Sequence, residues 1–222
     1  TGTPLTINDK DTQEVFGNYI DVYDMSQSVE DGSTKPIYYE NRVINLNLND
    51  QMLKEIDAKY DELAQITNEN DIEQSKRELS RMEALLGSEQ AIDTLVKDII
   101  EHYEENREHL LTGKAMIVAY NREIGIKIYK KVLELRPNWD EKIKVVMTGN
   151  NNDPEEWKQY IGSKFDRDEL AKKFKDNDDP MKIAIVVDMW LTGFDVPSLA
   201  TMYVYKPMKS HNLMQAIARV NR

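Results

Sequence analysis

The sequence has no cysteine and only three histidines among its 222 residues. The lack of cysteine excludes disulfides and thiolate-bound zinc. His102 and His109 could share a helix face, but no third ligand is evident, so we expect a solvated face and no metal site. No apolar run approaches the ~18 residues that a membrane span needs, and no signal-peptide pattern occurs. We therefore expect a cytoplasmic protein without a membrane partner.

Two signatures of a complete nucleotide site are also missing. The phosphate-binding GxxxxGK[ST] motif does not occur, and the pair Gly113-Lys114 is followed by Ala115 and an apolar stretch. The tripeptide DEL occurs at 61–63 and 168–170, but neither copy follows an apolar strand, as a magnesium-binding acid would. A site made from this chain alone would lack its phosphate cradle and its metal ligand. We therefore expect no ATPase activity from this chain by itself.

Positive charge is scarce in one half of the chain and not in the other. The net charge is −11, which argues against a protein that coats nucleic acid. Residues 1–110 carry a net charge of −15, whereas residues 111–222 carry +4. The second half can therefore face phosphates although the whole chain is acidic. An apolar content of 40% indicates a globular protein.

The first half divides into a connector and a helical segment. Residues 1–50 mix short apolar pieces with turn formers, and Ile44, Leu46 and Leu48 alternate with asparagines as in a half-buried strand. We interpret this segment as an extended connector. Residues 51–110 have apolar residues at helical spacing, which predicts packing stripes. The stripes comprise Met52, Leu53, Ile56, Tyr60 and Leu63; Leu79, Met82, Leu85 and Leu86; and Ile92, Leu95, Val96, Ile99, Ile100 and Tyr103.

Residues 111–222 alternate between short apolar runs and helical patterns. Strands are predicted at 114–120, 142–148, 181–187 and 201–206, and helices at 121–135, 154–161, 167–174 and 211–222. Three of the strands are fully apolar, which indicates an α/β fold with a parallel sheet covered by helices on both faces. Ligands of such sheets bind at the carboxyl ends of the strands.

Three candidate groups follow predicted strands. Thr192, Gly193 and Asp195 belong to TGFDVP, a turn that could present its carboxylate to a ribose hydroxyl or an arginine. Asn121 and Arg122 follow the first strand, and Thr148 and Gly149 follow the second; both pairs could offer backbone N–H groups or short polar side chains to a phosphate. Ordinary turn chemistry is the alternative for each group.

The last eight residues, QAIARVNR, suggest an anion site on a helix. At helical spacing Gln215, Arg219 and Arg222 share one face, while Leu213, Ile217 and Val220 lie nearly opposite and are predicted to pack on the sheet. Two guanidinium groups without a nearby acid repel each other and gain most from a polyphosphate between them. The alternative is a solvated basic helix end. Arginines that await a phosphate held by another domain have the form of arginine fingers.

These motifs together resemble a known family. TGFDVP followed by QAIARVNR resembles motifs V and VI of superfamily 2 helicases, with Ala218 in place of the usual glycine. KAMIVAYNRE, VVMTG and VVDMWLTGFDVP make the match closest to the R (motor) subunit of type I restriction enzymes. The opening TGTP resembles motif III, and because the chain starts with threonine we interpret it as a piece of a longer protein. The resemblance is weakest over 51–110.

The resemblance implies a fold, an activity and partners. It implies a connector from the first motor lobe at 1–50, a helical segment at 51–110 and a second RecA-like lobe at 111–222. Such R subunits hydrolyse ATP with Mg²⁺, pull double-stranded DNA and cut it, in complex with methylation (M) and specificity (S) subunits. The nuclease domain, the P-loop and the magnesium ligand would lie upstream, so ATP and Mg²⁺ would be held mainly by the first motor lobe of the same chain.

The resemblance also implies residue roles. Arg222 would be the arginine finger on the γ-phosphate, and Arg219 would contact the same phosphates or anchor the charges between the lobes. Gln215 would orient the pair, and Gly193 and Asp195 would meet the ribose or position the arginines. The residues implied to contact the DNA backbone are Thr192, Asn121, Arg122, Thr148 and Gly149.

Two other interpretations remain open. The chain could belong to another superfamily 2 DNA helicase or translocase, since motifs V and VI alone allow it. It could also be a RecA-like binding module without enzymatic activity, whose acidic residues 1–110 dock a protein partner. Hydrolysis of ATP by the full-length protein on long DNA would separate the enzymes from the binding module.

Overall fold

The computed structural model describes residues 6–7, 10–11, 23–42, 80–111, 113–150, 153–208, 216–217 and 220. The predicted strand around Ile44 and the first helical stripe, from Met52 to Leu63, lie outside the described residues.

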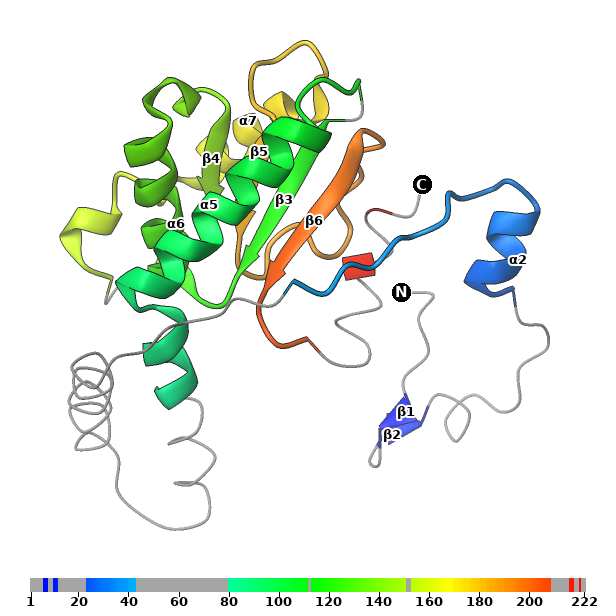
Figure 1. Ribbon diagram of the computed structural model, residues 1–222, viewed down its shortest axis with the longest axis horizontal. Coiled ribbons are helices and arrows are strands. Elements are labelled where there is room, and N and C mark those ends of the chain that lie inside the picture. Colours follow the sequence, from blue (N-terminus) through cyan, green and yellow to red (C-terminus); the bar gives the residue numbers. More distant parts are fainter. Residues whose placement is uncertain are drawn as a thin grey trace.

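The described residues contain a four-stranded sheet in which every pairing is parallel. The strands are β3 (Lys114–Ala119), β4 (Ile143–Val146), β5 (Ile183–Val186) and β6 (Leu199–Tyr205), in the order β4-β5-β3-β6 (Figure 1). The register aligns Ile117 of β3 with Ile185 of β5 and with Tyr203 of β6. Each strand overlaps its prediction, so the α/β fold class is confirmed.

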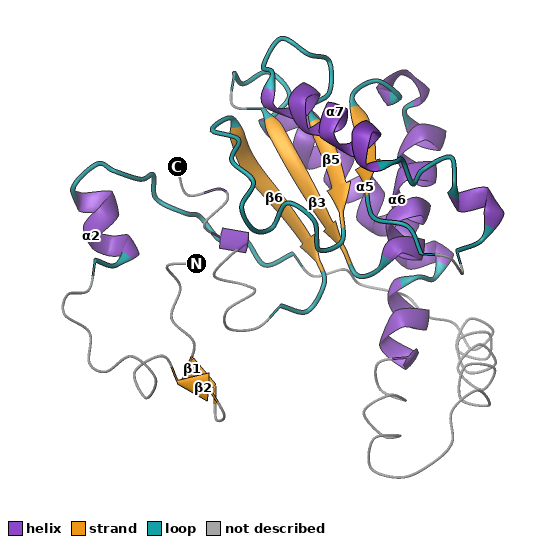
Figure 2. Cartoon of the chain, turned by 180° about the vertical axis from the view of Figure 1, so that it is seen from behind, coloured by secondary structure: helices purple, strands orange, loops and turns teal. Residues whose placement is uncertain are grey.

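Helices cover both faces of the sheet. In Figure 1, α5 (Glu89–Asn106) and α6 (Arg122–Leu135) lie in front of it, and Figure 2 shows α7 (Lys164–Lys175) on the other face. Side chains of a strand alternate between faces, so Ile117 joins a first core with α5 and α6, while Met116 joins a second core with Phe174 of α7. Burial on both faces explains why all six residues of β3 are buried.

The helix predictions hold best where capping residues and apolar spacing agree. The stripe from Ile92 to Tyr103 is buried along α5, which Ser88 caps at its start. Ser163 and Asp166 form a capping box at the start of α7. The helix predicted at 154–161 is wrong in extent, because Pro154 opens only the short 3-10 helix η2 (Glu155–Trp157).

The stripe before α5 is also corrected. Met82, predicted to pack, has 42% of its surface exposed, and Ala84 is buried instead. Leu85 and Leu86 are half-buried, and Leu86 packs against the first core.

The N-terminal part contains a helix that the sequence analysis did not predict. Helix α2 (Met25–Glu30) begins at Asp24, which forms a capping box with Gln27. Strands β1 (Thr6–Ile7) and β2 (Lys10–Asp11) form a small antiparallel pair. Residues 35–42 have no regular secondary structure.

His102 departs from the predicted solvated face. Its Nδ1 lies 2.8 Å from the hydroxyl oxygen of Tyr203 on β6. Burial lowers the pKa of His102 below its ordinary value. His109 is exposed, as expected. Among the described residues no cluster of histidine and acidic side chains could hold a metal ion, and none of the helices found there is long and apolar enough to cross a membrane.

Lys114 joins β3 to the end of α7. Its side chain is buried, and Nζ donates to the carbonyls of Lys173, Phe174 and Asp176 at 3.4, 2.5 and 2.5 Å. Burial lowers the pKa of Lys114 to about 8. The last carbonyls of a helix have no partner within the helix, and they carry the negative end of its dipole. Lys114 therefore acts as a structural cation that satisfies the carbonyls at the end of α7.

Candidate nucleotide and DNA interface

Arg122 joins the turn after β3 to the loop after β4. Its Nη1 donates to the carbonyl of Thr148 at 3.2 Å and to Oδ2 of Asp153 at 2.5 Å. The guanidinium also lies over the ring of Trp157, with the carbon at its centre 5.7 Å from the ring centroid. Asp153 additionally accepts the backbone N–H of Asn150. The structure thus brings two of the predicted groups together, and holds Arg122 with an acid that the sequence analysis missed.

Asn121 is already engaged within the chain. Its Oδ1 accepts the backbone N–H of Ile124 at 2.9 Å, which caps α6, and its Nδ2 donates to the carboxylate of Glu83. Asn121 therefore sets where α6 begins, and this places Arg122 in the first turn of the helix.

Gly149 stands where the chain approaches Ile161 closely. Both Thr148 and Gly149 are exposed. A Cβ at Gly149 would lie 2.8 Å from Cγ2 of Ile161, which is closer than two carbons pack. The absence of a side chain thus allows the loop after β4 to fold back on residue 161 and keeps the backbone of 148–149 open to solvent.

We expect Gly149→Ala to lower the free energy of unfolding by about 1–2 kcal/mol, because the new methyl group overpacks against Ile161. Urea unfolding of the purified chain measures this change. In the Ile161→Ala background the same substitution should cost clearly less, since Cγ2 is then absent. An equal cost in both backgrounds would exclude the steric explanation.

Stacked aromatic rings anchor the loop that carries TGFD. The ring centroids of Trp190 and Phe194 lie 4.1 Å apart at an interplanar angle of 12°, and Phe174 of α7 stacks on Trp190 at 5.5 Å. Trp190 has a φ of +65°, a left-handed conformation that is uncommon for a bulky residue. The stack holds a strained turn in place on the second core.

The polar residues of the same loop form an exposed tip. Thr192, Gly193 and Asp195 are exposed, while Leu191 and Val196 on either side are buried. Gly193 has a φ of +68°, which favours glycine, and nothing lies within 4 Å of a Cβ placed there. Buried anchors and an exposed polar tip make this loop suited to contacting a ligand or another domain.

The predicted residues therefore lie in two separate groups. One group surrounds Arg122 and includes Asn121, Thr148 and Gly149, and the other lies on the TGFD loop and comprises Thr192, Gly193 and Asp195. Trp157 beside Arg122 packs against the first core, whereas Phe194 packs against the second. The sequence predicts that the candidates after each strand all lie at the carboxyl ends of the strands. By Phe194 the loop has instead reached the end of α7, because it must return the chain to the amino end of the sheet, where β6 begins.

The closing segment is described at three residues. Ala216, Ile217 and Val220 are helical, as predicted. Val220 packs against the second core, as predicted, but the buried residue beside it is Ala216, while Ile217 is only half-buried. The small side chain of Ala216 is 1% exposed and belongs to the second core. Leu213 and the three residues assigned to the phosphates, Gln215, Arg219 and Arg222, lie outside the described residues.

One ion pair at the carboxyl end of the sheet was not predicted. Oδ1 of Asp188, just after β5, lies 2.6 Å from Nζ of Lys206, which directly follows β6. The only sequence signal for Asp188 was an acid directly after an apolar run, and nothing in the sequence pointed to Lys206 as its partner.

Comparison with known proteins places the chain in a family. Residues 148–222 match the sequence family "Type I restriction enzyme subunit R domain 3", and residues 1–76 match the SWI2/SNF2 ATPase family. The HindI type I restriction enzyme endonuclease subunit of Haemophilus influenzae is 44% identical over 231 residues, which cover 100% of this chain. The chain is homologous to part of a type I restriction enzyme R subunit. A Methanocaldococcus jannaschii protein assigned as the same subunit is 42% identical, also over 100% of the chain.

The comparisons also show what fraction of such a subunit the chain corresponds to. The chain spans 21% of the length of both relatives, about a fifth. A solved fragment assigned as the HsdR subunit of a type I restriction enzyme from Vibrio vulnificus has the same fold, with a TM-score of 0.60 at 14% identity. The match covers 100% of this chain and 35% of the length of the solved fragment. The likeness confirms the fold class over the described sheet.

Proposed function

We propose that this chain is the second motor lobe, with its connector, of an R subunit that translocates double-stranded DNA at the expense of ATP and cleaves it. The identity of 44% to an endonuclease subunit over the whole chain carries this proposal. The SWI2/SNF2 ATPase match at residues 1–76 supports the use of ATP and Mg²⁺, which a neighbouring lobe of the same chain would hold. The boundaries at residues 50 and 110 stay a prediction.

The geometry supports different roles for the two groups of residues, one toward the nucleotide and one toward the DNA. Ala216 and Val220 pack on the second core beside the TGFD loop. Helical spacing in the sequence puts Gln215, Arg219 and Arg222 on another face than Ala216, so these side chains would be available to a nucleotide held by the first lobe. Gly193 and Asp195 lie on the exposed tip of the same loop and would meet the ribose or the arginines.

DNA contacts would come from the sheet end and the loop tip. Thr148 and Gly149 offer exposed backbone, and Thr192 is exposed. Arg122, whose charge is paired with Asp153, would contribute by holding the carbonyl of Thr148 in place. Asn121 would act through its cap on α6. Contacts to phosphates are blind to sequence, which suits a motor that must move along any DNA. The M and S subunits are the proposed partners, and they would methylate the DNA and recognise its target sequence.

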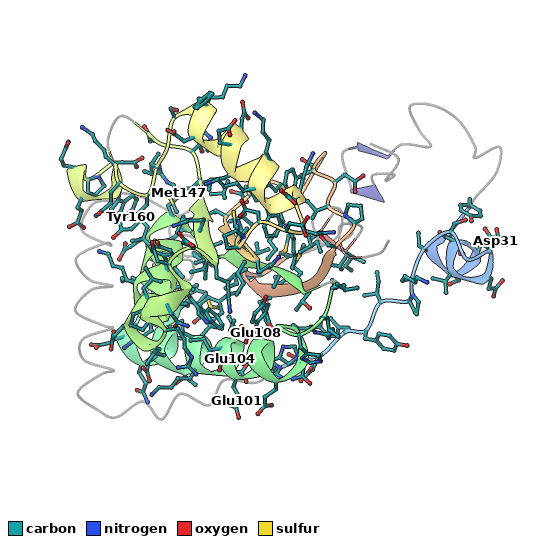
Figure 3. All side chains as sticks on the ribbon, turned by 90° about the horizontal axis from the view of Figure 1, so that it is seen from above. Asp31, Glu101, Glu104, Glu108, Met147 and Tyr160 are labelled. Atoms are coloured by element: carbon teal, nitrogen blue, oxygen red, sulfur yellow. The ribbon has the colours of Figure 1, made fainter. Side chains whose placement is uncertain are left out.

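The binding-module alternative loses support from α5. Two of the acids of this helix are engaged with arginines outside it: Glu104 accepts from Arg136 at 2.6 and 2.9 Å, and Asp98 accepts from Arg42 at 2.6 Å. Glu108 pairs with Lys142. Figure 3 labels Glu101 and Glu104 on α5, and Glu108 just after the end of that helix. An acid already paired at short range offers less charge to a docking partner.

The proposal is tested with the full-length subunit assembled with its M and S subunits. We expect ATP hydrolysis that depends on Mg²⁺ and on double-stranded DNA, with a rate that rises with DNA length as a translocating motor requires. An ATPase that needs no M or S subunit would favour another helicase or translocase. Absence of DNA-dependent hydrolysis would favour the binding module.

A further inference from the structure

The ion pair between Asp188 and Lys206 spans the carboxyl end of β3, although neither residue is part of that strand. Asp188 follows β5 and Lys206 follows β6, and β3 lies between these two strands in the sheet (Figures 1 and 2). Neighbouring strands lie about 4.8 Å apart, so the pair closes a gap of about 10 Å between strand axes. The two side chains thus reach across the carboxyl end of β3.

The pair also joins the starts of two segments that carry the candidate residues. Asp188 begins the connection that leads through the Trp190–Phe194 anchor to the exposed tip at Thr192 and Gly193. Lys206 begins the segment that leads to the helical residues Ala216 and Val220 on the second core. No other described contact joins the beginnings of these segments by side-chain charge.

The small free energy expected for the Asp188–Lys206 pair suits a contact that positions the chain better than one that stabilises the fold. The side chain of Asp188 is 78% exposed and that of Lys206 is 24% exposed. Exposed ion pairs contribute little to stability, about 0–1 kcal/mol. A contact of this kind can be made and broken during a motor cycle, while it still restricts where the two segments begin.

We propose that Asp188 and Lys206 are positioning residues that couple the TGFD loop to the segment carrying Gln215, Arg219 and Arg222. DNA bound at the loop tip would thereby favour the arrangement in which the arginine segment meets the nucleotide. This inference rests on the proposed function, since it concerns coupling between the DNA and ATP sides of the same lobe. Coupling of this kind is shown by the two residues acting as a unit.

The test is a double-mutant cycle in the full-length subunit with M and S subunits, read as ATP turnover on long DNA. We expect Asp188→Asn and Lys206→Met each to lower turnover about three- to fivefold, the most that an exposed pair worth about 1 kcal/mol can contribute. The double variant should be no slower than the slower single variant. The charge reversal Asp188→Lys with Lys206→Asp should recover turnover to the wild-type value.

Controls separate coupling from folding and from the proposed function. The midpoint of thermal unfolding should be unchanged in every variant, and Glu169→Gln, which breaks an exposed 2.5 Å pair with Lys172 on α7, should keep wild-type turnover. Independent, multiplying effects of the two substitutions, or wild-type turnover in both single variants, would overturn the coupling alone. A wild-type protein without DNA-dependent turnover would overturn the proposed function first.

Discussion

Replacement of Arg222 by alanine in the full-length subunit should abolish DNA-dependent ATP hydrolysis, with a loss on the order of a thousandfold or more in turnover. The reason is electrostatic: charge develops on the transferred γ-phosphate, and a planar guanidinium placed there stabilises it. Steady-state ATP hydrolysis on long DNA measures the loss. DNA affinity, measured separately at fixed salt, should stay near the wild-type value because the phosphate contacts of the DNA are made elsewhere.

The matched control is an arginine away from the proposed interface. Arg136 follows the last residue of α6, at the opposite end of that helix from Arg122, so Arg136→Ala should leave both turnover and DNA affinity unchanged. Arg222→Lys should remain strongly impaired, because an ammonium cannot reproduce the fork of the guanidinium. Hydrolysis at the wild-type rate by Arg222→Ala would remove the arginine-finger role from this residue.

Lys114→Met should cost about 3–5 kcal/mol of unfolding free energy, since each buried acceptor left without a donor costs about 1–3 kcal/mol. Methionine refills most of the volume of the lysine stem but donates no hydrogen bond. The carbonyls of Phe174 and Asp176 would then end α7 without a partner beneath the aromatic stack that anchors the TGFD loop. Urea unfolding at pH 7 measures the change, below the lowered pKa of about 8, where the ammonium is present.

Lys182→Met provides the comparison for Lys114→Met. Lys182 is also a lysine at the amino end of a strand, and its Nζ donates to the carbonyl of Asn177 at 2.6 Å, but at the surface. Water can replace this donor, so we expect a change below about 1 kcal/mol. Similar values for the two variants would show that the buried carbonyls find another partner and that Lys114 does not hold the end of α7.

Residues whose role follows from local spacing were predictable. The all-apolar run in KAMIVAY gave β3, because a strand buried on both faces has no polar side to show. The spacing from Ile92 to Tyr103 gave the buried face of α5. The cap that Asn121 makes at the start of α6 was not predicted, although its side chain is of a kind that commonly caps helices. Thr192 and Gly193 were read as an exposed turn, and the positive φ of Gly193 agrees with that reading.

Contacts between distant segments were not predictable. Asp153 beside Arg122, Tyr203 beside His102, and Lys206 beside Asp188 are each distant in the sequence, and no local pattern marks such pairs. The exposure of Met82 was missed for the same reason, since helical spacing shows which residues share a face but not whether that face is covered.

The sequence by itself determined the alternation of strands and helices, the burial of the central strands and the motifs that connect this chain to type I R subunits, because these depend on periodicity and on residue order. The tertiary structure alone decided that the candidate residues form two groups, that aromatic rings fix the TGFD loop against α7, and that an ion pair bridges β5 and β6 over the end of β3. Those features depend on which strands become neighbours, and strand order is set by packing of the whole sheet and not by any local stretch of residues.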